Sequence, residues 1–166
     1  YPDLYNRLII LNGWSKTYAM TGWRLGWGVW PEHLIEHVFK FCVNNHSCVN
    51  TAAQYGAIAA LDGPEKHLND MMKEFSIRRK LIVDGLNSLK GIKCNLPGGS
   101  FFAFPNVKET GMNGEEFTKK CLEKAGVAVI PGTAFGKFAT DYVRINFATS
   151  RENISKAIEK IDKILK

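Results

Sequence analysis

A segment rich in glycine and tryptophan, residues 12–28, constrains this chain most tightly because it holds one lysine, Lys16, and one arginine, Arg24. An apolar run at 7–11 precedes this segment, and a second apolar run at 25–30 closes it. Each run predicts a short buried strand. Lys16 is therefore expected on an irregular turn between two strands, where a rigid scaffold can hold a catalytic group.

The chemistry open to Lys16 depends on its surroundings. A lysine in a loop is usually a solvated surface charge. The nearby glycines and tryptophans instead predict close packing, and a desolvated lysine amine loses basicity and forms Schiff bases with aldehydes. Arg24 suits a phosphate dianion because a guanidinium donates two parallel hydrogen bonds. A ligand that is both an aldehyde and a phosphate describes pyridoxal phosphate (PLP), which this spacing suggests.

Composition narrows the classes of protein to which the chain can belong. Its 166 residues suffice for one good core, and 45% hydrophobic with 23% charged residues are typical of a globular protein. No apolar run approaches the length of a membrane span, and no signal peptide is visible. The net charge of +6 is scattered over predicted helical faces among acidic residues. We therefore expect a solvated surface and neither a nucleic-acid nor a membrane partner.

The cysteines and histidines form no recognisable metal motif. No CxxC pair occurs, so we expect free buried thiols in a reducing cytosol and hence a cytoplasmic protein. His33 and His37 lie one helical turn apart, but no third ligand is nearby, and a helix surface is the preferred interpretation. The four cysteines are Cys42, Cys48, Cys94 and Cys121.

The apolar periodicity predicts an α/β segment followed by an α+β domain, with a boundary at Asp62-Gly63-Pro64. We interpret residues 1–62 as the trailing part of a larger α/β domain and residues 63–166 as a compact domain with helices on one small sheet. The expected order is two strands, three helices and then β-β-α-β-β-α. Helices are expected to begin at Pro31 and after Ser150, and to span 50–61 and 64–90. A further helix is expected from a capping box of Asn113 and Glu116 to Gly126. The later strands are expected at 92–95, 100–104, 127–130 and 142–147.

The strand at 142–147 places Arg144 on the side opposite the apolar residues Val143, Ile145 and Phe147. A buried guanidinium without a partner is costly. Two interpretations follow. Arg144 forms an internal salt bridge, or it is a receptor that binds a ligand carboxylate through two parallel hydrogen bonds.

Four stretches together resemble a known family. Residues 15–26, Ser-Lys-Thr-Tyr-Ala-Met-Thr-Gly-Trp-Arg-Leu-Gly, are similar to the PLP-lysine signature of the class I/II aminotransferases, the aspartate aminotransferase family. Residues 97–104, 127–136 and 143–150 resemble later motifs of that family, in the same order and rough spacing. The resemblance covers essentially the whole chain.

The resemblance implies a fold and a set of site residues. Residues 1–62 would be the trailing part of the large PLP-binding α/β domain, and residues 63–166 the small C-terminal α+β domain, of a fold-type I PLP enzyme. Lys16 would hold PLP as a Schiff base and then act as general base and acid. Arg24 and Ser15 would hold the cofactor phosphate, and Arg144 the substrate α-carboxylate. The sequence departs from some members at Gly13, where they carry a phosphate-binding serine.

The resemblance also implies what this chain lacks. Members are roughly twice as long and carry upstream the aspartate that pairs with the cofactor's ring nitrogen. The chain begins Tyr-Pro-Asp without Met, so we expect a fragment that is inactive alone, from a homodimeric aminotransferase acting on an aspartate-type amino acid and a 2-oxo acid. Related PLP lyases, synthases and decarboxylating members share these residues. Two alternatives stand outside the enzyme class: the sensor domain of a PLP-binding transcription regulator, and a module without a ligand.

Overall fold

The computed structural model describes residues 1–166, and the chain divides into two compact units, Tyr1–Asn69 (the N-terminal unit) and Asp70–Lys166 (the C-terminal unit). The division falls inside helix α4 (Lys66–Asn87), seven residues after the predicted boundary at residue 62. A continuous helix therefore carries the chain from one unit into the next.

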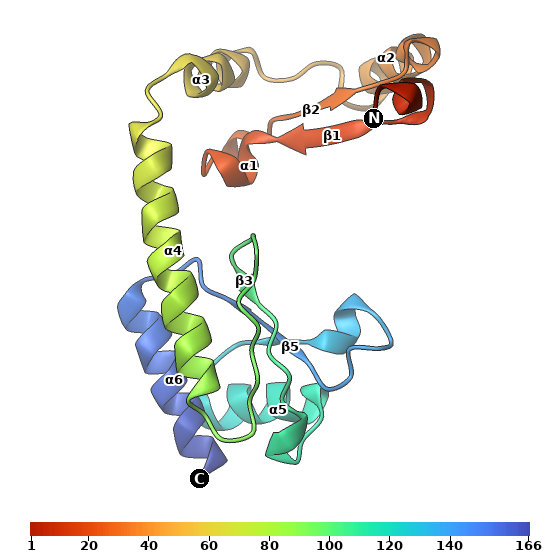
Figure 1. Ribbon diagram of the computed structural model, residues 1–166. Coiled ribbons are helices and arrows are strands. Elements are labelled where there is room, and N and C mark those ends of the chain that lie inside the picture. The colour runs from red at the N-terminus through yellow and green to blue at the C-terminus, as the bar shows by residue number, and fades with distance from the viewer. The chain divides into compact units, whose positions relative to one another are not determined.

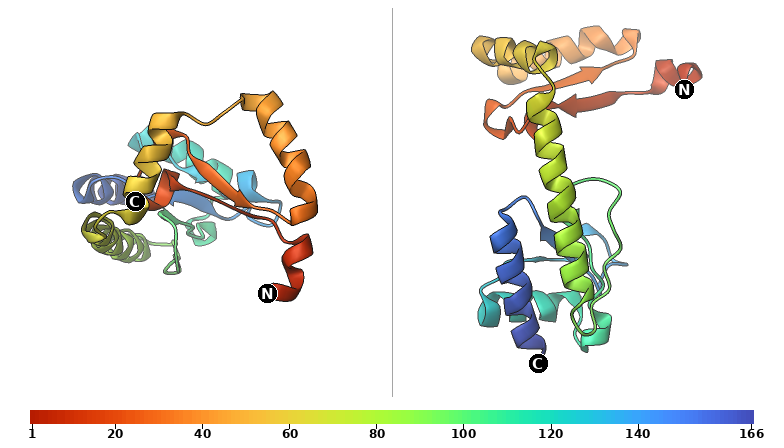
Figure 2. Two further views of the ribbon diagram at one scale, coloured as in Figure 1. Left: turned by 90° about the horizontal axis from the view of Figure 1, so that it is seen from above. Right: turned by 60° about the vertical axis from the view of Figure 1, so that its left-hand side comes forward.

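The N-terminal unit is built on one β-hairpin. Strands β1 (Ile10–Gly13) and β2 (Gly26–Val29) pair antiparallel, from Ile10 opposite Val29 to Gly13 opposite Gly26, and they run side by side in Figures 1 and 2. The turn between them contains two short helical segments. The remaining elements of the unit are η1 (Pro2–Arg7), α1 (Trp14–Thr17), η2 (Thr21–Trp23), α2 (Glu32–His46) and α3 (Thr51–Asp62).

The prediction that both strands are buried is wrong. Every residue of β2 is exposed, and so is all of β1 except the half-buried Gly13. The two strands pair only with each other, so no third strand extends this sheet. The buried residues of this unit form a small cluster beside the hairpin, comprising Met20, Leu25, Ala53 and Ala57.

Helix α3 has the clearest local causes in the N-terminal unit. The Asn50 side chain accepts a hydrogen bond from the backbone N–H of Ala53 at 2.9 Å, which satisfies one of the free amides at the helix start. A Cβ atom at Gly56 would lie 2.5 Å from the Trp23 ring, so only glycine lets α3 approach η2 this closely. The predicted helix over 50–61 is confirmed.

The C-terminal unit contains a three-stranded antiparallel sheet in the order β3-β5-β4. Its strands are β3 (Phe102–Ala103), β4 (Ile130–Pro131) and β5 (Val143–Asn146). The Val143 and Ile145 side of β5 joins one core with helices α4, α5 (Gly114–Lys120) and α6 (Arg151–Leu165). Figures 1 and 2 show α4 and α6 side by side in this unit. The predicted arrangement of helices on one small sheet is therefore observed.

The strand predicted at 92–95 is replaced by a single bridge between Lys93 and Asn106. The Asn87 side chain accounts for the difference, because its amide donates to the Cys94 carbonyl at 2.9 Å and its oxygen accepts from the Cys94 N–H at 2.8 Å. A side chain thus satisfies backbone groups that a neighbouring strand would otherwise pair. The strands predicted at 100–104 and 127–130 are shortened to β3 and β4.

The predicted helix ends are largely confirmed. Asn113 and Glu116 form the complete capping box of α5, and Ser150 Oγ accepts from the Asn153 N–H at 3.1 Å at the start of α6. After α5 the chain continues through a π-helical turn, η4 (Cys121–Ala125), and stops at Gly126 in the left-handed conformation with φ 62°. Helix α4 ends at Asn87, three residues before the predicted end.

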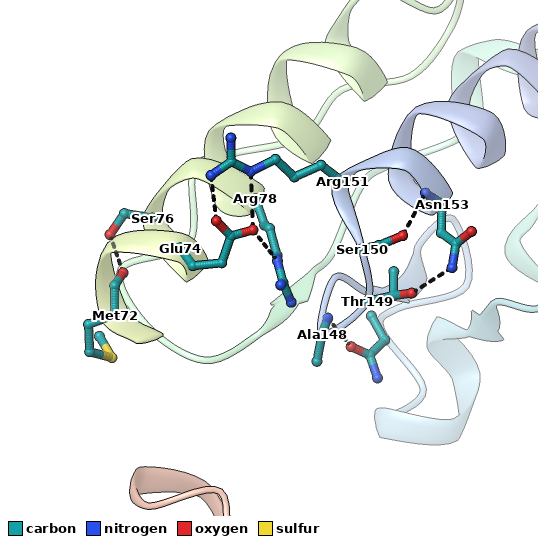
Figure 3. Close-up of polar contacts among 10 residues, drawn as sticks. Met72, Glu74, Ser76, Arg78, Ala148, Thr149, Ser150, Arg151 and Asn153 are labelled. Carbon is teal, nitrogen blue, oxygen red and sulfur yellow. Dashed lines mark hydrogen bonds and ion pairs between the residues drawn. The ribbon is translucent and has the colours of Figure 1, made fainter. Parts of the chain in front are cut away.

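One carboxylate links the two long helices of the C-terminal unit. Figure 3 shows Arg151 of α6 and Arg78 of α4 directed at Glu74. Arg151 Nε donates to Glu74 Oε1 at 3.1 Å, Arg151 Nη2 donates to Glu74 Oε2, and Arg78 Nε donates to Oε1 at 2.7 Å. The hydrogen bonds from Arg151 and Arg78 lower the pKa of Glu74 to about 2.

Candidate functional site

Lys16 lies in α1, the short helical turn between the paired strands β1 and β2. The turn is attached to the hairpin by the Trp14 N–H, which donates to the Leu25 carbonyl at 3.4 Å. A Cβ atom at Gly13 would lie 2.8 Å from the Leu25 oxygen, so a serine at this position would not fit without backbone movement. The predicted placement of Lys16 on a turn between two strands is confirmed.

The expected desolvation of Lys16 is wrong. Lys16 is exposed, and the Trp23 and Trp27 residues have exposed fractions of 50% and 43%. The apolar faces of the hairpin have no covering layer in this chain, so glycines and tryptophans alone do not create a dry environment. Residue type alone does not determine how tightly Lys16 is packed, because packing depends on which elements contact one another.

Arg24 occupies a strained position next to an open hollow. Its backbone is left-handed, with φ 57° and ψ 48°, a conformation that is uncommon outside glycine and is enriched at binding sites. Its Nη1 atom donates to the Thr21 carbonyl at 3.1 Å, and it forms no ion pair. The hollow has a volume of about 600 Å³ and is lined by Ala19, Gly22, Trp23, Arg24, Asn50, Ala52 and Ala53.

Ser15 is half-buried in the same helical turn as Lys16. Consecutive residues of a helix point about 100° apart, because a turn contains 3.6 residues. Ser15 and Lys16 therefore project in different directions from α1.

Arg144 lies in β5 of the C-terminal unit and is half-buried. Its guanidinium carbon is 4.1 Å from the centre of the Phe102 ring and 4.4 Å from the centre of the Phe135 ring. Arg144 forms no ion pair and its side chain donates no hydrogen bond, so the internal salt bridge considered from the sequence is absent. A half-buried cation without an anionic partner is the expected form of a carboxylate receptor.

Phe102 and Phe135 contact Arg144 but belong to none of the residues predicted as site residues from the sequence. Phe102 lies in β3 and Phe104 directly after it, both on the Arg144 side of the sheet, and Phe135 follows β4 in the short segment η5 (Gly132–Phe135). The alternation of Phe102 and Phe104 around the buried Ala103 is a signal that two rings share the polar side of the sheet. No sequence spacing predicts that Phe135 returns to Arg144.

The cysteines and histidines lie apart from these residues. Burial raises the pKa of the Cys94 thiol and raises that of Cys121 to about 12, so neither is a nucleophile near neutral pH. All four cysteines are free, but Cys48 is exposed and Cys42 half-buried, so the prediction that all are buried is wrong. His33 and His37 are exposed on α2, and the chain contains no group of three or more potential metal-ligating side chains.

The candidate residues divide between the two units. Ser15, Lys16 and Arg24 belong to the N-terminal unit, whereas Arg144 with Phe102 and Phe135 belongs to the C-terminal unit. None of the helices has both the length and the apolar character needed to cross a bilayer.

Comparison with known proteins shows that the chain is similar to members of one family. The chain matches Aminotransferase class I and II over residues 1–161. It is 42% identical over 165 residues to an aspartate aminotransferase of Pyrococcus abyssi, covering 98% of this chain and 42% of that protein. It is 39% identical to aromatic-amino-acid aminotransferase 2 of Thermococcus litoralis, with 98% and 42% of the two chains covered. The chain thus spans about two fifths of the length of these relatives.

Solved structures share the fold. The aspartate aminotransferase from Rhizobium meliloti gives a TM-score of 0.94 at 35% identity, covering 99% of this chain and 43% of that chain. An aromatic aminotransferase from Pyrococcus horikoshii gives a TM-score of 0.92 at 42% identity, covering 97% and 43%. The fold class predicted from the sequence is confirmed.

Proposed function

We propose, because the chain belongs to the class I and II aminotransferase family, that it forms the C-terminal part of a PLP-dependent aminotransferase. The reaction moves an amino group between an amino acid and a 2-oxo acid. The observation that carries the proposal is the state of Arg144, a half-buried cation on a strand with no anionic partner in the chain. An amino acid and a 2-oxo acid both present the carboxylate that such a cation requires.

The residues around Arg24 fit the phosphate of the proposed cofactor. One Arg24 hydrogen bond goes to the Thr21 carbonyl, which leaves the other guanidinium donors for an anion. The hollow that Arg24 lines is concave and bordered by small residues, so it can admit a phosphate group. When bound, PLP supplies an aldehyde that condenses with amines and a ring that withdraws electrons.

Lys16 supplies the amine in this proposal. Its Nζ atom is the only lysine nitrogen on the segment between β1 and β2, eight residues before Arg24. Lys16 Nζ would hold the cofactor aldehyde, and as an amine at that position it would serve as general base and acid for the proton on the substrate Cα. Arg144 would bind the substrate α-carboxylate through two parallel hydrogen bonds.

The substrate proposed is an aspartate-type amino acid. The Tyr-Ala-Met-Thr-Gly-Trp-Arg form of residues 18–24 and the relatives named aspartate aminotransferase support this choice. The relative named aromatic-amino-acid aminotransferase makes the aromatic amino acids the competitor to test. The homodimer implied by the resemblance stays a prediction, as does the role of Ser15.

Borohydride reduction tests the proposal directly. The full-length protein is incubated with PLP, reduced with borohydride, digested and mapped by mass spectrometry. We expect one pyridoxyl label, on the peptide containing Lys16, because reduction traps only the amine bound to the aldehyde. We expect the Lys16→Ala variant to lose the label and at least about a thousandfold of its transamination rate.

The matched control is Lys40→Ala, which removes an exposed lysine of α2 that pairs with Glu36 in the same unit. This variant should keep both the label and the rate. A label spread over surface lysines, or none, would contradict the proposal. Release of ammonia without amino transfer to a 2-oxo acid would replace the transaminase assignment with a lyase.

A further inference from the structure

Two aromatic rings contact the Arg144 guanidinium, and they come from different elements. Phe102 belongs to β3 and Phe135 to η5, which directly follows β4. Strands β3 and β4 flank β5 on its two sides, so each neighbour of the Arg144 strand delivers one ring. The ring centres lie 4.1 Å and 4.4 Å from the guanidinium carbon, well within the range of cation–π attraction.

The Phe135 ring is held by backbone anchors. The Gly132 N–H donates to the Tyr142 carbonyl at 2.7 Å, and a Cβ atom at Gly132 would lie 2.8 Å from that oxygen. The Thr133 hydroxyl bonds to Glu115 of α5. The segment that carries Phe135 is therefore fastened to β5 and to α5, although the Phe135 side chain itself is not packed in the core.

The two rings contribute little to the core. Neither Phe102 nor Phe135 belongs to the core cluster or to the apolar residues packed against it, and Phe135 is 49% exposed. The apolar surface that these rings expose to water is therefore not offset by burial of the rings in the core. The contact with Arg144 is what these two rings share.

Aromatic rings that stack on the guanidinium restrict the rotamers of the Arg144 side chain but do not occupy its N–H donors. A free arginine side chain has a large rotamer entropy, which a ligand must offset when it orders the side chain. Arg144 donates no hydrogen bond within the chain, so its donors remain available to a carboxylate. An ordered guanidinium with unused donors is a preorganised carboxylate receptor.

We propose that Phe102 and Phe135 are positioning residues of the carboxylate site, which hold the Arg144 guanidinium in place before the substrate arrives. The inference rests on the proposed function of Arg144. It extends that function by assigning substrate affinity to two rings, one from β3 and one from the η5 segment that follows β4.

Steady-state kinetics and ligand binding test this proposal in the full-length, PLP-loaded enzyme. Phe135→Leu and Phe102→Leu keep an apolar side chain but remove the ring. We expect each to raise KM for both the amino acid and the 2-oxo acid by about tenfold, with kcat changed less than about twofold. The Kd of succinate, a dicarboxylate with no amino or oxo group to react, should rise by a similar factor in calorimetry.

Three variants make the result specific. Phe135→Tyr keeps a ring and should restore KM and Kd to within about twofold of the original values. Phe138→Leu is the matched control, because Phe138 is 88% exposed and its ring contacts Lys137 rather than Arg144. In a double-mutant cycle, Phe135→Leu should add little to Arg144→Lys, since both act through the same group.

The outcomes separate this proposal from the proposed function. If Arg144→Lys raises KM but both leucine variants leave KM and Kd within about twofold, the rings have no positioning role and the aminotransferase assignment stands. If Arg144→Lys also leaves KM unchanged, Arg144 is not the carboxylate receptor and both proposals fail. Far-ultraviolet circular dichroism of each variant shows whether it is folded, and if one leucine variant is unfolded the other leucine variant decides the result.

Discussion

The two units of this chain bury their residues to very different degrees. The core cluster of the C-terminal unit contains 16 buried residues, some of them from α4, α5, α6 and the sheet, whereas that of the N-terminal unit contains four. Helix α2 of the N-terminal unit has no buried residue at all, and both strands of its hairpin are exposed. The comparison shows that sequence can specify helices and a hairpin without burying them, because burial depends on what packs against them.

The difference also divides the candidate site. Lys16 and Arg24 lie in a turn that is hydrogen-bonded to a lightly packed hairpin through the Trp14 N–H and the Leu25 carbonyl. Arg144 instead projects from the central strand of a well-packed sheet. Stability varies across a structure with the density of buried contacts. We therefore expect Arg144 to be held more rigidly within its unit than Lys16 is within the N-terminal unit.

The largest expected effect comes from core truncation. Phe147→Ala removes a fully buried ring of the C-terminal unit and should lower the free energy of unfolding by about 3–5 kcal/mol. Leu25→Ala, in the small N-terminal cluster, should cost about 2 kcal/mol or less, since a thinly covered site can collapse around the deletion. Urea unfolding of both variants measures the two costs, and an equal loss at both sites would remove the contrast between the units.

A smaller and pH-dependent effect is expected at Glu74. The hydrogen bonds from Arg151 and Arg78 hold the pKa of Glu74 at about 2, below its ordinary value of 4.5. A carboxylate with a lowered folded-state pKa stabilises the fold above its unfolded pKa, and this contribution is lost as pH falls from about 4.5 toward about 2. Glu74→Gln should therefore lower the urea midpoint of unfolding at pH 6. The difference in midpoint between this variant and the unmodified chain should shrink toward zero near pH 2.5.

The matched control for Glu74 lies in the N-terminal unit. Glu36 pairs with Lys40 along the exposed surface of α2, so Glu36→Gln should change the midpoint little at any pH. Equal pH dependence in the two variants would show that the link between α4 and α6 contributes no more than a surface ion pair.

The smallest expected effect compares two helix caps. Asn113→Ala removes the capping box of α5 and should cost about 1 kcal/mol of global stability. Asn50→Ala removes the cap of α3, whose unit has little core, so the loss should appear as faster amide hydrogen exchange in α3. If exchange in α3 is unchanged while global stability falls, α3 is coupled to the main core more tightly than its burial indicates.

The sequence by itself determined features that depend on near neighbours in the chain. The capping box of Asn113 and Glu116, the cap at Ser150 and the alternation that turns Arg144 away from Val143 and Ile145 are all confirmed. So is the turn that carries Lys16 between two strands. Each of these depends on side chains and backbone groups within a few residues of one another, and that short range is what a sequence displays.

Tertiary structure alone decided the features that join distant residues. It left the hairpin exposed, replaced the strand at 92–95 by hydrogen bonds from Asn87, and gave Arg144 two rings in place of an ion pair. Gly132 fits against the Tyr142 carbonyl at the start of the segment that brings Phe135 to Arg144. Burial and long-range contact depend on how elements pack in space, which residue spacing along the chain does not encode.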